Sequence, residues 1–139
     1  MSNNKLLYLE IVTPKKIVFS GNVKNITVPG ELGSFQILYN HAPIISNLIT
    51  GEIKIRKEND EMEYYVCEGG FVFVLRNRIT IMSDSIVHAN DIDTNQVENE
   101  LNDLKRKLTK SRKYENADLI EKLIMFNKLK LKVAKRIST

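Results

Sequence analysis

The spacing of hydrophobic positions changes once along the chain, between Ser83 and Asp93. Before this stretch, short apolar runs are separated by polar turns containing glycine, proline or asparagine, which is typical of β-strands. After it, apolar residues recur every three or four positions, and no glycine or proline occurs beyond Gly70. A change of period indicates that two structural units meet there. We therefore predict a strand-rich unit over residues 1–88 and a helical unit over residues 89–139, with 83–93 as the hinge.

The first unit has the pattern of eight or more short strands. Gly69-Gly70 predicts a bend and Arg76-Asn77 a tight turn, and the run 71–75 is wholly apolar, so we expect it in the core. No segment between strands is long enough for a crossover helix, so we exclude parallel units and predict an antiparallel β-sandwich or barrel. The expected strands are 6–12, 16–19, 23–28, 35–38, 53–56, 64–67, 71–75 and 78–82.

The second unit has the pattern of two helices. Asp93 with Gln96 three residues later fits a capping box, and Val97, Leu101, Leu104 and Leu108 then form one apolar seam. Residues 109–115 are expected to be the turn, and Asn116 can cap a second helix with two adjacent apolar stripes. The fold class is thus α+β: an N-terminal antiparallel β-sandwich or barrel followed by a C-terminal antiparallel two-helix hairpin.

The net charge of +4 is distributed unevenly along the chain. Residues 1–104 carry 9 basic and 14 acidic side chains, whereas residues 105–139 carry 12 basic and 3 acidic ones. A basic tail on an acidic body predicts an acidic partner for the tail, and charge alone leaves protein, nucleic acid and lipid open. A small β-barrel with a basic helical tail that binds nucleic acid is therefore the alternative. Against it, no strand interleaves aromatic and basic residues as a base-stacking platform requires.

Candidate chemistry is sparse. His41 and His88 lie in different segments, and Cys67 sits in a strand, where a small buried hydrophobe is the simpler interpretation. No nucleophile elbow or phosphate-binding P-loop motif occurs, so we predict a binding or structural subunit without catalytic residues, metal or cofactor. The polar N-terminus predicts no secretory or import leader, the apolar runs are too short to span a bilayer, and a single cysteine suits a reducing cytoplasm.

Several separate motifs carry a resemblance to a known family. They are V-T-P-K-K-I-V-F-S-G at 12–21, V-P-G-E-L-G-S-F-Q-I-L-Y-N-H-A-P at 28–43 running on to Gly51, Y-V-C-E-G-G-F-V-F-V-L-R-N-R-I-T-I-M at 65–82, and D-I-D at 91–93. In this order and spacing they resemble the epsilon subunit of bacterial F-type ATP synthases, while the helical part matches in pattern only.

The resemblance implies a non-catalytic subunit of the rotating central stalk, seated against the gamma subunit and the ring of c subunits, without a role for nucleic acid. It implies a peripheral position on the cytoplasmic side of the bacterial inner membrane. In bacterial members the hairpin can extend along gamma into the catalytic alpha and beta subunits and restrain ATP hydrolysis. The candidate contacts to gamma and the c-ring are Glu31, Ser34, Phe35, Gln36 and His41, and those of the regulatory helix are Phe126, Lys128, Lys132, Lys135 and Arg136.

Some family members bind ATP at the start of the first helix through a motif of the form I-D-x-x-R-A. Here Ile92 and Asp93 match, but Gln96 stands in place of the arginine and Val97 in place of the alanine. A glutamine lacks the fixed positive fork that pairs with phosphate. We therefore expect ATP binding at Ile92 and Asp93 to be weak or absent.

Overall fold

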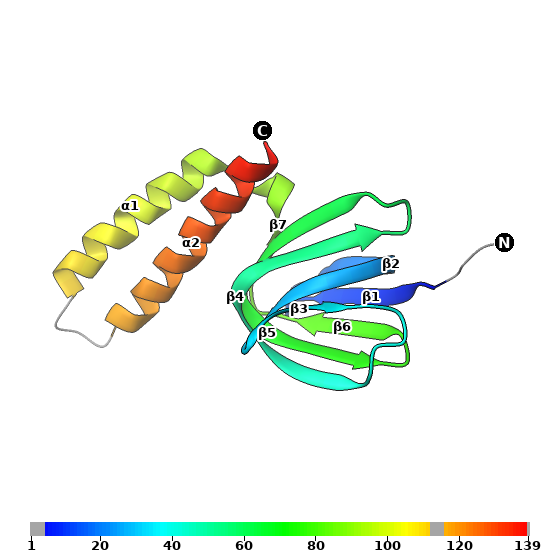
Figure 1. The fold of residues 1–139 in the computed structure, drawn as a ribbon. Helices are drawn as coiled ribbons and strands as arrows, with labels where there is room; N and C mark the ends of the chain where they lie inside the picture. The colour runs from blue at the N-terminus through cyan, green and yellow to red at the C-terminus, as the bar shows by residue number, and fades with distance from the viewer. Residues whose placement is uncertain (1–4, 112–115, 139) are drawn as a thin grey trace.

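The computed structural model describes residues 5–111 and 116–138 and has a β-sandwich with a helical hairpin packed on one side (Figure 1). The predicted fold class is confirmed. The elements are β1 (Leu7–Val12), β2 (Ile17–Gly30), β3 (Gly33–Ile37), β4 (Ile44–Lys57), β5 (Met62–Leu75), β6 (Arg78–Met82), β7 (Ile86–His88), the 3-10 turn η1 (Ala89–Asp91), α1 (Thr94–Ser111) and α2 (Ala117–Ile137).

The sheet closes on itself. The strand order is β1-β6-β5-β4-β2-β3, and β1 also pairs with β2, so five strands form a ring. The exclusion of parallel pairing was wrong, because β1 runs parallel to β6. These two strands are far apart in the chain, and everything between them makes the connection that a crossover helix makes in a βαβ unit. The remaining pairs are antiparallel.

The strands are longer than their sequence pattern predicted. β2, β4 and β5 each have 14 residues, so glycines that were expected to end strands lie inside them. Gly70 shows why the prediction failed: its φ is +138°, and a Cβ there would lie 2.0 Å from the Met82 carbonyl oxygen. Glycine therefore lets β5 bend sharply against β6 without interrupting its pairing.

The sandwich core is a continuous apolar cluster contributed by every strand from β1 to β6. Strand alternation decides which side chains enter it. The prediction that 71–75 is a core strand was half right: Val72 and Val74 are fully buried, but Phe71, Phe73 and Leu75 point outward and are 53%, 43% and 42% exposed.

The two helices lie antiparallel, with α2 between α1 and the sandwich (Figure 1). The Asp93 cap is confirmed, since its Oδ1 accepts the Gln96 backbone N–H at 3.2 Å. The Gln96 side chain does not complete the capping box but donates to Glu100 instead. Asn116 occupies the N-cap position of α2 without a side-chain capping bond. Residues 109–111, predicted as turn, continue α1, and 112–115 lie outside the described residues.

The predicted hinge carries structure of its own. Its middle forms the short strand β7, which pairs with β5 through Tyr65 and His88, and then the turn η1. Ser83, at the start of this stretch, is buried and donates to the carbonyl of Gly69 at 2.6 Å. A three-residue strand has too little pattern to be found from sequence, since its existence depends on an edge of β5 being available.

Candidate subunit-docking surfaces

An exposed apolar face lies on the outside of β4, β5 and β6. We call Ile45, Phe71, Phe73, Leu75 and Met82 the apolar face; each is between 42% and 73% exposed. Their proximity follows from register, because Phe73 is opposite Ile45 on β4, and Phe71 is opposite Met82 on β6. Residues opposite one another in an antiparallel pair point to the same side. Contiguous exposed apolar side chains of this size are typical of an interaction surface.

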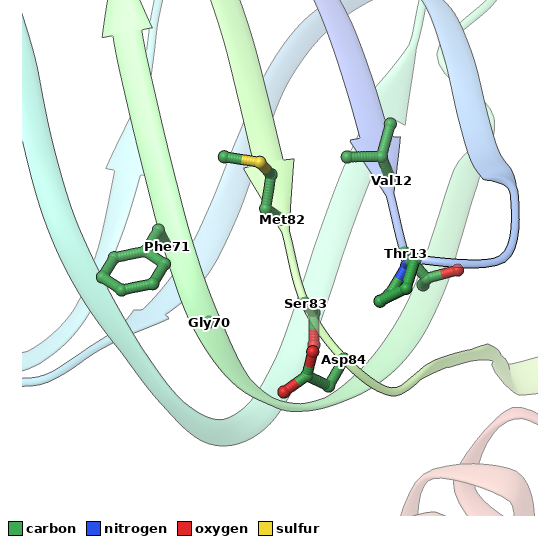
Figure 2. A pocket seen from close by; sticks show the side chains of 8 residues that line it. Val12, Thr13, Gly70, Phe71, Met82, Ser83 and Asp84 are labelled. Atoms are coloured by element: carbon green, nitrogen blue, oxygen red, sulfur yellow. The ribbon is translucent and has the colours of Figure 1, made fainter.

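A cleft of about 380 Å³ borders this face where β1 and β6 end (Figure 2). Phe71 and Met82 line one side of it, and Val12 and Thr13 the other. Its far end is the bend at Gly70 with Ser83 and Asp84. The apolar face therefore includes a depression into which a partner side chain can fit, with a carboxylate at its end.

The five residues expected to contact other subunits do not form one cluster. Glu31 and Ser34 lie at the exposed tip of the β2–β3 hairpin, where Glu31 accepts a hydrogen bond from the Asn47 side chain at 3.3 Å. Phe35 is half-buried against the sandwich core, and Gln36 beside it is exposed. His41 lies beyond the other end of β3, next to the turn at Asn40 that is hydrogen-bonded to Asn77.

Three of the predicted regulatory residues, Phe126, Lys135 and Arg136, make contacts within the chain. Phe126 is 3% exposed and belongs to a second cluster with Val66, Ala89 and Val133. We call these four the docking cluster. Arg136 forms a two-pronged ion pair with Glu52 on β4, whose pull raises the arginine pKa, and lies over the Tyr64 ring at 5.1 Å. Lys128, Lys132 and Lys135 are exposed, and Lys135 lies 3.7 Å from Glu98.

The docking cluster depends on strand alternation in β5. Tyr65 and Cys67 point into the sandwich core, whereas Val66 between them points out and is covered by α2. Glu52, opposite Val66 on β4, shares this outer face. Sequence reasoning missed both Val66 and Glu52 as hairpin contacts. An apolar residue on the outer side of a strand was the signal that could have identified Val66, as for Phe71 and Phe73.

A polar cluster of Lys57, Glu63, Tyr65 and His88 lies where β5 pairs with β7, just before η1 and the start of α1. Burial alone would raise the pKa of Glu63, but the hydrogen bonds from Lys57 and Tyr65, together with the charges of Lys57 and His88, outweigh burial and lower it. Burial raises the pKa of the Tyr65 phenol far above its ordinary value, and the Glu63 carboxylate adds to the shift. The cluster therefore holds Glu63 ionised and Tyr65 neutral.

The residues that the sequence offered as candidates for chemistry can each be located in the described part of the chain. The nearby histidine, cysteine and carboxylate side chains include no group of three that could hold a metal ion. Burial raises the pKa of the Cys67 thiol, which disfavours the reactive thiolate. Gln96, at the position where the nucleotide motif needs arginine, is exposed. Among the described helices, none is long and apolar enough to cross a membrane.

These features define a class of protein: a small sandwich with a docked helical hairpin, equipped to bind other proteins through exposed surfaces. The family model described as "ATP synthase, Delta/Epsilon chain, beta-sandwich domain" matches residues 6–89. An ATP synthase epsilon chain of Leptospira interrogans is 35% identical over 136 residues, covering 98% of this chain and 100% of the relative. That of Maricaulis maris is 32% identical over 85% of this chain and 88% of its own length.

The chain belongs to the ATP synthase epsilon-chain family. Solved structures agree on the fold. A chain of the Euglena gracilis mitochondrial ATP synthase aligns with a TM-score of 0.68 at 18% identity, covering 99% of this chain and 82% of that one. A chain from the central stalk and c-ring of the Tetrahymena thermophila mitochondrial ATP synthase aligns with a TM-score of 0.53 at 17% identity. The alignment covers 96% of this chain and 96% of that one. None of these relatives favours the nucleic-acid alternative.

Proposed function

We propose that this chain is a non-catalytic rotor subunit of an F-type ATP synthase that links the gamma subunit to the c-ring during proton-driven ATP synthesis. The apolar face is the observation that supports this role best. A monomer that exposes two phenylalanines, a leucine, an isoleucine and a methionine side by side leaves a surface that a partner stabilises by burial. Relatives carry the name epsilon chain, and one similar structure is a central stalk with its c-ring.

We assign the apolar face to gamma. Co-purification with gamma tests this assignment, using the full chain and the variant Phe73→Ser. Phe73 lies at the centre of the face between Ile45 and Thr80, so its loss should weaken binding at least tenfold. Ile17→Ser is the matched control, since Ile17 is 59% exposed but lies outside the face. Equal retention of gamma by both variants would contradict the assignment.

The β2–β3 tip is the candidate contact to the c-ring. Leu32 is fully exposed there between Glu31 and Gly33, so its side chain is accessible to a partner. Glu31 and Ser34 are its neighbours in this proposal, whereas Phe35, Gln36 and His41 lie further along and take a secondary part. Cysteine cross-linking from position 32 to the c subunit tests this contact. Cross-links from position 41 but not from position 32 would show that the region around His41, and not the β2–β3 tip, contacts the c-ring.

We further propose that the hairpin leaves the sandwich and restrains ATP hydrolysis by the alpha and beta subunits. Lys128, Lys132 and Lys135 are exposed on α2, where they can meet acidic segments of those subunits. Phe126 and Arg136 then have a second role, because both hold the hairpin in its docked position. Hydrolysis by the assembled complex should rise when residues 1–88 replace the full chain. Unchanged hydrolysis would contradict the inhibitory role and leave the stalk role standing.

We place the protein at the cytoplasmic face of a bacterial inner membrane, held there through the complex. We also propose that residues 1–88 and 89–139 fold as separate domains, and that ATP binds weakly or not at all beside Ile92 and Asp93. The Gln96 side chain donates to Glu100 and offers no cation for phosphate. Calorimetry with MgATP tests this last point; tight binding that Gln96→Ala abolishes would contradict it.

A further inference from the structure

The cleft beside the apolar face ends in a carboxylate. Its walls are apolar, with Phe71 and Met82 on one side and Val12 on the other (Figure 2). Asp84 lies at the end of the cleft, and its side chain is exposed. Among the residues that the structure describes, none forms a hydrogen bond or an ion pair with the Asp84 carboxylate. The cleft therefore offers a negative charge in apolar surroundings, where a cation is attracted more strongly than in open water.

Hydrogen bonds fix the loop that carries Asp84. Ser83 before it is buried, donates its hydroxyl to the Gly69 carbonyl at 2.6 Å, and donates its backbone N–H to the Val12 carbonyl at 3.1 Å. The carbonyl of Ser85 after it accepts a backbone N–H from β5 at 3.0 Å. These bonds tie the loop to β1 and β5 on both sides of Asp84. A group that is held in place before binding loses less entropy when a partner arrives.

Two lysines lie in the neighbourhood of this carboxylate. Lys122 of α2 lines a second cavity of about 630 Å³ together with Asp84. Lys15 follows Pro14, which lines the cleft itself. In the described part of the chain, neither lysine forms an ion pair with Asp84. A cation that pairs with Asp84 would therefore come from another molecule.

We propose that the cleft binds an arginine side chain of the partner that covers the apolar face, with the guanidinium group paired to Asp84. The proposal rests on the assignment of that face to gamma and names one contact within it. The cleft is continuous with the face, because Phe71 and Met82 belong to both. A partner that buries the face therefore lies over the mouth of the cleft and can insert a side chain into it.

The walls of the cleft favour arginine over lysine. The methylene stem of an arginine can lie along apolar side chains such as Val12 and Met82 while its charged head reaches the end of the cleft. Its planar guanidinium can stack on the Phe71 ring, which is 53% exposed, and can donate two parallel hydrogen bonds to one carboxylate. A lysine would supply the charge without the planar stacking or the paired hydrogen bonds. We therefore expect the partner to present an arginine within its own apolar surface.

Binding of gamma to full-length variants tests the contact. Asp84→Asn removes the charge and keeps the shape, so gamma should bind about tenfold more weakly, and with less dependence on salt than for the unaltered chain. Glu58→Gln is the matched control, since Glu58 is exposed in the turn between β4 and β5 and lies outside the cleft. Asp84→Glu keeps the charge and should retain most of the binding. Equal affinity for Asp84→Asn and Glu58→Gln would overturn the proposal.

Arginine-selective labelling of gamma identifies the side chain in the cleft. At saturating concentrations, the unaltered chain should protect one gamma arginine from a dicarbonyl reagent, and Asp84→Asn should leave it reactive, as measured by mass spectrometry. Equal protection by both chains, or protection of a lysine from acetylation instead, would overturn the arginine contact. If Phe73→Ser weakens binding and Asp84→Asn does not, the cleft proposal alone fails. If neither variant weakens binding, the assignment of the apolar face to gamma fails as well.

Discussion

The sandwich and the hairpin are held together by interactions of very different extent. The sandwich core draws fully buried side chains from six strands, and long-range backbone pairing closes the ring. The hairpin rests on the sandwich through the four residues of the docking cluster, some partly buried neighbours and the Arg136–Glu52 ion pair. The interactions within the sandwich are therefore far more extensive than those that hold the hairpin on it.

The largest effect should come from the sandwich core. Ile81 on β6 is completely buried, and Ile81→Ala should lower the free energy of unfolding by ~2–5 kcal/mol, because it deletes core contacts and leaves a cavity. Urea denaturation measures this. Thr80→Ala on the same strand, half-buried on the outer side, should cost much less. If Ile81→Ala and Thr80→Ala lowered the free energy of unfolding equally, burial in the core would not be the source of the stability.

The next effect should be confined to the hairpin. Phe126→Ala removes the largest member of the docking cluster, a change that costs ~3–5 kcal/mol in a closed core. Here we expect the hairpin to undock while the urea midpoint of the sandwich stays nearly constant. Hydrogen exchange of α2 and β5 amides would show this separation. Met125→Ala is the control, since the adjacent Met125 is 60% exposed. Joint unfolding of both regions would contradict two independent units.

A smaller effect should follow from the ion pair. Arg136→Gln leaves the stem of the side chain but removes the charge and the fork that meets Glu52, so docking should weaken by about 1 kcal/mol. The same hydrogen-exchange experiment measures it, and Lys132→Gln, which removes an exposed charge from the same helix, should do little. A double-mutant cycle with Glu52→Gln should find the two substitutions non-additive; simple additivity would exclude the pair as the source.

The smallest effect concerns acid. The pKa of Glu63 is lower in the folded chain than its ordinary value of 4.5, so its contribution to stability is present above that pH and is lost as pH falls through the folded value. Glu63→Gln should make the free energy of unfolding depend less on pH below about pH 4.5. Near pH 7 the slope of that dependence should change little. Denaturation midpoints at several pH values measure this. An unchanged slope below pH 4.5 would mean that the cluster around Glu63 does not stabilise its charge.

The amino-acid sequence by itself determined the two units, the Arg76-Asn77 turn, the Asp93 cap and the family. Each of these structural features depends on neighbouring residues alone. The spacing of apolar residues separates the strands from the helices, the turn needs positive φ at Arg76 and Asn77, and the cap needs the Asp93 carboxylate three residues before the Gln96 backbone N–H. The motifs between residues 12 and 93 identified the family because they follow one another in a fixed order and spacing along the chain.

Tertiary structure alone decided the rest. The parallel β1–β6 pair and strands that continue through glycine depend on where distant segments meet, which no local pattern encodes. The same limit applies to the surfaces. Phe71 and Phe73 look like core residues in the sequence because they are apolar, and Phe126 looks like a possible partner contact for the same reason. Apolar character states that a side chain is to be buried, but only the packed structure decides whether the chain itself or another subunit buries it.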